Sequence, residues 1–225
     1  MLRGKMNKLK PTDKAACEMV ENFCGYFIGL KAKLNIYEEL FEDDEAKLLM
    51  EKTAKAFFLD FNEIIVSCLL LEFAKITDRE CSKTREGERE NCTVNNLINV
   101  VDWPDNTKKR LEELKKETES FHSLIEPARN RLLAHYDKES FLSNAVLGTF
   151  TSDEGIKFVK ALEEICNITH QACFGSIVGD IVVSMPGDVQ ELKETLRKAL
   201  VYDRLFSEGN IEERTKLLKY RRKLE

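Results

Sequence analysis

Three side chains suited to cleaving a phosphodiester bond lie close together between Arg129 and Asp137. Asn130 follows Arg129 directly, and His135 comes six positions after Arg129. An arginine is a permanent cation that can hold a phosphate through two hydrogen bonds. A histidine titrates near neutral pH and can therefore accept or give a proton. Such a set could cleave RNA without a metal ion, because RNA carries its own nucleophile, the ribose 2′-hydroxyl.

The spacing within this motif constrains how its side chains can meet. On an ideal helix, residues six apart lie about 120° apart around the axis and about 9 Å apart along it, whereas residues four apart are nearly in line. A straight helix would therefore pair His135 with Arg131, not with Arg129. Either a kink near the motif or a site shared by two copies of the chain across a two-fold axis would bring Arg129 and His135 together. The spacing alone is common by chance, so the surrounding sequence has to support the assignment.

The composition indicates a helical globular protein. Hydrophobic residues make up 43% of the 225 positions, and there are only four prolines and ten glycines. Long stretches rich in Leu, Glu, Lys and Ala therefore predict an all-α fold. No stretch approaches the length of an apolar membrane span, and residues 1–8 lack the apolar segment of a signal peptide, so we expect a cytoplasmic protein with no membrane partner. Its seven cysteines are expected to be reduced thiols.

The overall charge does not favour nucleic acid. The net charge is −5, from 40 acidic and 35 basic residues, so any RNA site must be a local basic patch. Two candidate patches lie near the ends of the sequence, and for each the simpler alternative is a solvated helix end or a frayed terminus. The patches are Arg3, Lys5, Lys8 and Lys10 at one end, and Arg214, Lys216, Lys219, Arg221, Arg222 and Lys223 at the other.

Apolar residues recur at helical spacing through most of the chain. The charged segment 78–91, which contains Gly87, lacks this pattern and predicts an exposed loop. Pro127 predicts a bend or a new helix start just before the motif. The predicted helices run over about 13–34, 44–76, 94–101, 106–125, 153–180 and 188–206, followed by a short basic helix.

The motif resembles the signature of a known family. Arg129-Asn130-Arg131-Leu132-Leu133-Ala134-His135-Tyr136-Asp137 is similar to the R-N-x-x-x-A-H-x-D signature of the HEPN superfamily of ribonucleases, and most similar to its abortive-infection protein U branch. Two further stretches resemble that branch's helix ending in a Leu-Thr-Asp turn and its Asn-Leu-Thr segment. They are Leu69-Leu70-Leu71-Glu72-Phe73-Ala74-Lys75-Ile76-Thr77-Asp78 and Asn91-Cys92-Thr93-Val94-Asn95-Asn96-Leu97. The resemblance covers roughly residues 15–175 and leaves out the final helices.

The resemblance implies a fold, an activity and a partner. The fold would be a HEPN-like helical bundle forming one domain over 1–225, with its core at about 15–175 and additional C-terminal helices at about 186–225. Two copies would dimerise through the motif-bearing helices and share one cleft. The activity would be that of a metal-independent endoribonuclease of bacterial antiviral defence, or of a toxin, without a cofactor. His135 would accept the 2′-hydroxyl proton, Arg129 would hold the phosphate and Asn130 would orient the groups. The residues expected to contact RNA are Arg131, Tyr136, Asp137 and Lys138.

Two alternatives stay open at this point. Arg129 could be a surface residue while His135 interacts with the last carbonyls of a helix. The domain could also be a catalytically silent binding or scaffold subunit of a defence system. An antitoxin or another defence protein is a further partner that the family suggests. Some toxin members, however, carry a tyrosine two residues after the histidine, which a nucleotidyltransferase antitoxin modifies, and here Asp137 stands in that place.

Two other histidines bear on the site. Cys166, His170 and Cys173 recur at i, i+4 and i+7, which puts them on one helix face and could supply three zinc ligands. The same spacing is typical of a core stripe, and no fourth ligand lies nearby, so we expect no metal. His122 precedes the motif on the same predicted helix, where it could line the cleft or be an ordinary surface or core residue.

Overall fold

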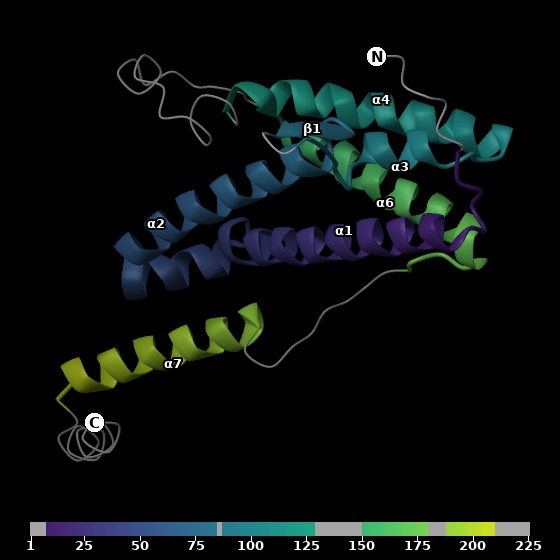
Figure 1. Cartoon of the computed structure of the whole chain (residues 1–225). Helices are drawn as coiled ribbons and strands as arrows, with labels where there is room; N and C mark the ends of the chain where they lie inside the picture. Colours follow the sequence, from purple (N-terminus) through teal and green to yellow (C-terminus); the bar gives the residue numbers. More distant parts are fainter. Residues whose placement is uncertain (1–7, 85–86, 129–149, 180–187, 210–225) are drawn as a thin grey trace. The chain divides into compact units, whose positions relative to one another are not determined.

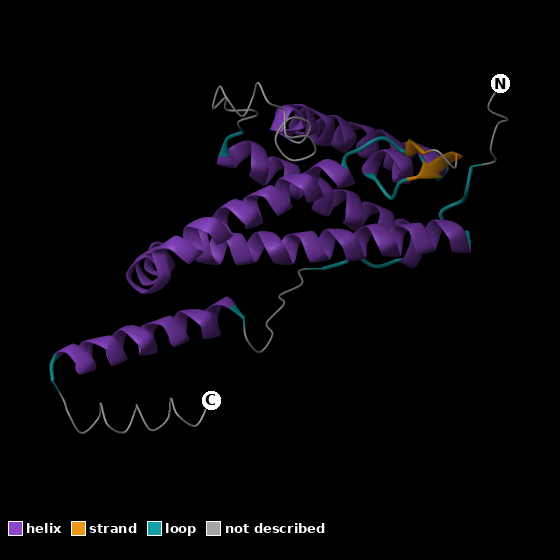
Figure 2. Cartoon of the chain, turned by 60° about the vertical axis from the view of Figure 1, so that its left-hand side comes forward, coloured by secondary structure: helices purple, strands orange, loops and turns teal. Residues whose placement is uncertain are grey.

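Helices dominate the computed structural model, which describes residues 8–84, 87–128, 150–179 and 188–209 (Figure 1; Figure 2). This confirms the all-α prediction. Packing divides the chain into two compact units, Met1–Lys33 with Ser67–Val182 and Leu34–Val66 with Val183–Glu225. The helices of the described ranges are α1 (Lys14–Phe41), α2 (Asp44–Ile76), α3 (Val94–Val100), α4 (Asp105–Ala128), α6 (Ser152–Phe174) and α7 (Val189–Ser207).

The first unit has its core between α1, α2, α4 and α6. Each helix buries large apolar side chains there, as the spacing of the apolar residues predicts. Phe23 of α1, Ile76 of α2, Leu111 of α4 and Leu162 of α6 are all essentially inaccessible to solvent. Trp103, between α3 and α4, is buried as well, and its indole N–H donates to the carbonyl of Leu97 at 3.2 Å.

Side-chain caps define several helix ends. The hydroxyl of Thr151 accepts from the backbone N–H of Glu154, whose side chain accepts in turn from Thr151, which forms a capping box at the start of α6. Thr93 caps α3 in the same way through the N–H of Asn96. α6 ends at Phe174, earlier than predicted, because Gly175 adopts a left-handed conformation with φ of 72°.

Segment 78–91 contains a β-hairpin, and the prediction of a loop there was wrong for its central residues. β1 (Cys81–Thr84) pairs antiparallel with β2 (Gly87–Glu90). The pairing sets Lys83 opposite Glu88, and such opposite charges stabilise neighbouring strands. Both strands are short and polar, so they lack the alternation of apolar residues by which a strand is recognised.

The second unit is built from the end of α1, the first part of α2 and α7. Its core contains Leu40, Met50, Phe58 and Val189, with Phe41, Phe61, Leu192 and Leu196 packed against them. α7 begins after Asp188, whose side chain accepts from the N–H of Glu191. α2 is interrupted at Ala54, which has φ of −146° and ψ of 55°. The apolar pattern continues through Ala54 and gives no sign of this break.

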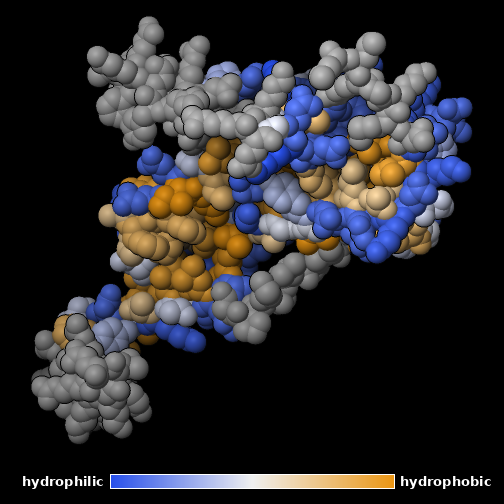
Figure 3. All heavy atoms as spheres, viewed as in Figure 1, coloured by the Kyte–Doolittle hydropathy of each residue, from blue (hydrophilic) through white to orange (hydrophobic). Residues whose placement is uncertain are grey.

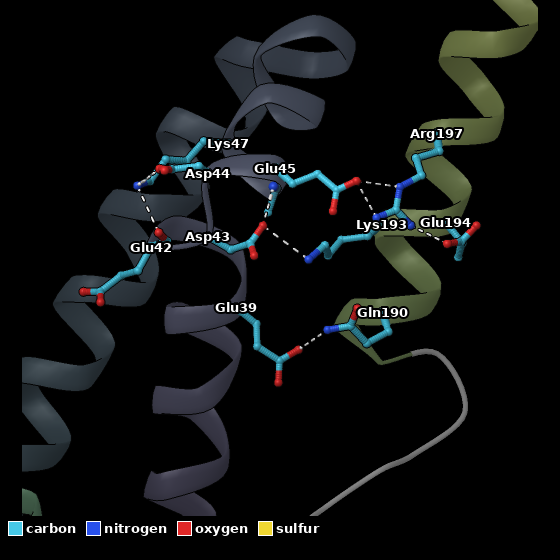
Figure 4. A network of polar contacts seen from close by, with 11 residues as sticks. Glu39, Glu42, Asp43, Asp44, Glu45, Lys47, Gln190, Lys193, Glu194 and Arg197 are labelled. Carbon is cyan, nitrogen blue, oxygen red and sulfur yellow. Dashed lines mark hydrogen bonds and ion pairs between the residues drawn. The ribbon is translucent and has the colours of Figure 1, made fainter.

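Polar contacts join α7 to the connection between α1 and α2 (Figure 4). Lys193 donates to Asp43 at 3.3 Å, and its side chain is only 8% exposed. Arg197 contacts one oxygen of Glu45 through Nε at 2.9 Å and Nη2 at 2.6 Å. The first half of α7 is therefore held by charged contacts as well as by its apolar residues.

An apolar surface accompanies the first part of α2. Figure 3 shows hydrophobic side chains gathered on part of the visible face. Phe57, Leu59 and Ile64 are all about 60% exposed, and the rings of Phe57 and Phe61 stack with their centroids 6.1 Å apart.

Candidate active site

α4 leads directly into the predicted active-site motif. Its described part ends at Ala128, and Arg129 is the next residue. Pro127 lies inside α4, so the helix does not restart there. The motif residues predicted to act on or bind RNA all lie within 129–149, outside the described residues: Arg129, Asn130, Arg131, His135, Tyr136, Asp137 and Lys138. Of the two basic patches, only Lys8 and Lys10 are described, and both are exposed. The structure therefore describes the elements that precede and follow the motif.

Aromatic packing anchors α4 close to the motif. Phe121 stacks on Phe158 of α6 with ring centroids 4.2 Å apart. Phe73 of α2 meets both rings edge-on, at 5.8 Å from Phe121 and 5.2 Å from Phe158. Ile125, one turn closer to the motif, is 1% exposed. Two helices, α2 and α6, thus fix the last turns of α4, because such a closely packed cluster of rings tolerates little displacement.

His122 of α4 is hydrogen-bonded to the end of α2. The hydroxyl of Thr77 lies 2.6 Å from Nδ1 of His122 and donates to the carbonyl of Phe73 at 2.8 Å. This hydrogen bond ties α4 to the residue that follows α2.

The turn after α2 is joined to the start of α3 by asparagine side chains. Asn95 donates to the carbonyl of Asp78 at 3.2 Å, and Asn96 donates to the carbonyl of Asn91 at 2.9 Å. Asn91 itself donates to the carbonyl of Arg79 at 2.9 Å. The two stretches that resemble the abortive-infection branch, 69–78 and 91–97, therefore meet in space beside α4.

Comparison with known families identifies the family to which this sequence belongs. The sequence model of the family HEPN_AbiU2, described as AbiU2, matches residues 13–199. The chain belongs to the HEPN_AbiU2 family. It is thus a HEPN domain related to abortive infection, as the sequence resemblance implied. Comparison with curated proteins gave no match, and comparison with solved structures gave none either.

The match covers more of this HEPN_AbiU2 chain than the sequence resemblance did. It begins at Asp13, just before α1, and it extends into α7, which starts at Val189. α7 was expected to be an addition outside the family likeness, and that expectation was wrong for residues 189–199. The family pattern therefore spans helices of both compact units.

A bidentate ion pair fixes α4 against α6 in the HEPN_AbiU2 chain. Nε and Nη2 of Arg110 donate to the two oxygens of Glu164 at 2.6 and 2.7 Å. These hydrogen bonds hold the pKa of Glu164 below its ordinary value, although burial acts in the opposite direction. The paired guanidinium and carboxylate set the register of the two helices from which the segment 129–149 departs and to which it returns.

The possible zinc ligands on α6 do not converge. Cys166 is buried, whereas Nδ1 of His170 lies 2.6 Å from the carbonyl of Ser176, just beyond the end of the helix. Within the described residues, no group of three His, Cys, Asp or Glu side chains is placed to hold a metal ion. Nor is any described helix long and apolar enough to cross a membrane.

Sequence reasoning missed the Thr77–His122 contact. The two residues are 45 positions apart, and neither belongs to the motif. A signal was nevertheless present, because Thr77 lies in the Leu-Thr-Asp-like turn that supports the family resemblance and His122 lies two turns before Arg129.

Proposed function

We propose that this chain is a metal-independent endoribonuclease of bacterial antiviral defence, with Arg129 and His135 as its catalytic residues. Membership of the HEPN_AbiU2 family carries the proposal. The placement of the elements supports it, because α4 is packed on α2 and α6 as far as Ile125, four residues before Arg129.

The reaction needs only the substrate and the side chains of the motif. His135 accepts the proton of a ribose 2′-hydroxyl, and the resulting oxyanion attacks the adjacent phosphorus. The bond from phosphorus to the 5′ oxygen of the next nucleotide breaks, and that oxygen takes a proton. Arg129 holds two phosphate oxygens and offsets the negative charge that builds up on them, while Asn130 orients the reacting groups. The products are a 2′,3′-cyclic phosphate and a 5′-hydroxyl, and DNA is not cleaved.

Two copies of the chain supply the site in this proposal. The six-residue spacing of Arg129 and His135 separates them on a straight helix, and a two-fold axis allows the arginine of one copy to meet the histidine of the other. Arg131, Tyr136, Asp137 and Lys138 would contact the RNA, and an antitoxin or defence-system protein would control the activity.

Cleavage of tRNA and total RNA in the presence of EDTA tests this function. The unaltered chain is expected to produce cyclic-phosphate ends, and Arg129→Ala and His135→Ala are each expected to abolish them. Arg79→Ala and His170→Ala make the same two changes outside the motif and should leave cleavage intact. Equal cleavage by all variants would show another site or a contaminant, and absence of cleavage by any would favour the silent binding or scaffold protein.

Mixed dimers test the shared site. Arg129→Ala and His135→Ala chains are inactive separately. Co-expressed, they form dimers in which one site regains an intact arginine and an intact histidine if these come from different copies. Partial recovery of cleavage is therefore expected. No recovery, in mixed dimers verified by two affinity tags, would mean that each site is built within one copy.

A further inference from the structure

Four cysteines form two facing pairs between α1 and α6. Cys17 and Cys24 are seven residues apart on α1, and Cys166 and Cys173 are seven residues apart on α6. Sγ of Cys24 lies 3.9 Å from the carbonyl of Cys166, and Lys31 pairs with Glu163 at 3.2 Å. The numbering rises along one helix as it falls along the other, so the two helices run antiparallel (Figure 1).

This register places Cys17 opposite Cys173. Residues seven apart lie on the same face of a helix, about 10 Å apart along its axis. The step from Cys24 back to Cys17 on α1 therefore has the same length and direction as the step from Cys166 forward to Cys173 on α6. Cys17 and Cys173 therefore lie at the same level of the two helices, and the neighbouring Cys17 helps to raise the pKa of Cys173. About 10 Å between the pairs is too far for all four thiols to bind one metal ion.

The two pairs differ in their access to solvent. Cys24 and Cys166 are 4% and 1% exposed, whereas Cys17 and Cys173 are only half-buried. An open groove of about 510 Å³ lies beside the outer pair, with Pro11, Gln171 and Ala172 among its lining residues. Sγ of Cys17 lies 3.5 Å from the carbonyl of Pro11, and Cys173 follows Ala172 directly. The groove therefore opens next to residues that adjoin the outer pair, whereas the inner pair is closed to solvent.

From this arrangement, we propose that Cys17 and Cys173 are a redox modification site, which a hydroperoxide converts into a disulfide between α1 and α6. No disulfide joins any of the seven cysteines, all of which the structure describes, so the reduced pair is the starting state. This inference does not depend on the ribonuclease activity.

The chemistry takes two steps. The thiolate of Cys17 attacks one oxygen of the hydroperoxide, the O–O bond breaks, and Cys17 becomes a sulfenic acid while the other oxygen leaves as an alcohol or water. Sγ of Cys173 then attacks the sulfenic sulfur. The S–S bond forms, the S–O bond breaks, and the departing oxygen leaves as water with the thiol proton of Cys173. The two thiols lose two electrons in all, the peroxide gains them, and a dithiol reductant reverses the change.

The order of the steps follows from the environment of the two thiols. Burial, together with the neighbouring Cys17, raises the pKa of Cys173 to about 12, so Cys173 is a protonated thiol at neutral pH. A thiolate is the nucleophile that reacts with peroxide. We therefore assign the first step to Cys17, which is half-buried in the first turns of α1, and the second step to Cys173.

Peptide mapping of the full-length chain after mild hydrogen peroxide treatment tests the proposal. The expected result is a peptide pair joining Cys17 to Cys173, lighter by two hydrogen atoms and lost on reduction with dithiothreitol. The disulfide closes a long loop, so oxidation should raise the thermal midpoint by about 10 °C. Cys17→Ser and Cys173→Ser should each remove both effects. Cys81→Ser, a control at another half-exposed cysteine, should keep both.

Other outcomes overturn the proposal. One such outcome is a disulfide between any two cysteines other than Cys17 and Cys173. Another is oxidation of Cys17 beyond sulfenic acid without a disulfide, and a third is a chain that peroxide leaves unchanged. Circular dichroism of the reduced variants checks that each is folded. If Cys17→Ser lost helicity, Cys17→Ala would replace it, because alanine suits a helix.

Discussion

The hydroxyl of Thr77 and Nδ1 of His122 lie 2.6 Å apart and join the end of α2 to α4. Thr77 is 5% exposed and also donates to the carbonyl of Phe73, one turn back on α2. The Thr77 hydroxyl therefore forms hydrogen bonds with a carbonyl near the end of α2 and with the histidine ring on α4. His122 belongs to α4, whose last described residue is Ala128, so this contact links the Leu-Thr-Asp-like turn to the helix that precedes the motif in the sequence.

Thr77→Val is expected to destabilise the first unit. Valine keeps the shape of threonine but cannot hydrogen-bond, so it leaves Nδ1 of His122 and the carbonyl of Phe73 without their partner. A buried group left unsatisfied costs about 1–3 kcal/mol. Urea unfolding should therefore show a loss of this size in the free energy of unfolding. Thr77→Ser retains the hydroxyl and should recover most of it, and a serine variant as unstable as the valine variant would contradict the role of the hydrogen bond.

Phe158→Ala is expected to cost more than any exposed aromatic substitution. Phe158 is 1% exposed and contacts the rings of both Phe73 and Phe121. Truncation of such a ring leaves a cavity and typically costs about 3–5 kcal/mol. Phe57→Ala, at a ring that is 63% exposed, should change the free energy of unfolding by less than about 1 kcal/mol. Comparable losses in the two variants, measured by urea unfolding, would argue against this aromatic cluster as the anchor of α4.

The sequence predicted most helices because the signals that start and stop a helix are local. Thr151 with Glu154, and Asp188 with Glu191, carry the capping pattern within four residues of sequence. The hairpin at 81–90 was missed because its stability comes from cross-strand pairs of polar residues, which leave no apolar period. The same contrast between local patterns and distant contacts applies to the candidate site. Arg129 and His135 form a pattern in sequence, whereas the Thr77–His122 contact and the facing cysteines depend on how distant helices pack.

Tyr26→Phe is expected to destabilise the first unit in a pH-dependent way. Tyr26 donates a hydrogen bond to the carboxylate of Glu72, whose side chain is 13% exposed. Burial raises the pKa of Glu72, but the hydrogen bonds from Tyr26 and Lys75 outweigh it, and the net pKa is below the ordinary value of 4.5. A depressed pKa contributes stability above the unfolded value and loses it as the pH falls through the folded one.

The loss from Tyr26→Phe should therefore be largest above pH 4.5 and shrink in more acidic solution. At neutral pH, a hydrogen bond to a charged group is worth about 1.5–3 kcal/mol. Urea unfolding at neutral and acidic pH gives both values. Tyr37→Phe, at a tyrosine of the second unit, provides the control. A loss that is the same at both pH values would show that the contact of the hydroxyl with the backbone carbonyl of Glu72 at 3.4 Å, not its contact with the carboxylate, is responsible.

Asp43→Ala is expected to loosen α7 within the second unit. Asp43 accepts from the backbone N–H of Ala46 at 2.7 Å and from Lys193 at 3.3 Å. The first of these contacts is the main cause of its lowered pKa, and Lys193 adds to it. Removing the carboxylate leaves the largely buried ammonium of Lys193 without its counter-charge, which is more damaging than removing both charges.

Amide hydrogen exchange over 189–207 measures this effect. Asp43→Ala should speed exchange in α7, whereas Lys193→Met should change it little, because methionine can fill the space of the lysine stem without a charge. Since the pKa of Asp43 is depressed, acidification of the unaltered chain below the ordinary value of 3.8 should reduce the protection of α7, measured as its exchange rate relative to that of an unfolded chain at the same pH. Gln190→Ala, at an exposed contact with Glu39, is the control. Faster exchange in Lys193→Met than in Asp43→Ala would show that the lysine stabilises α7 through its own packing and not by pairing with Asp43.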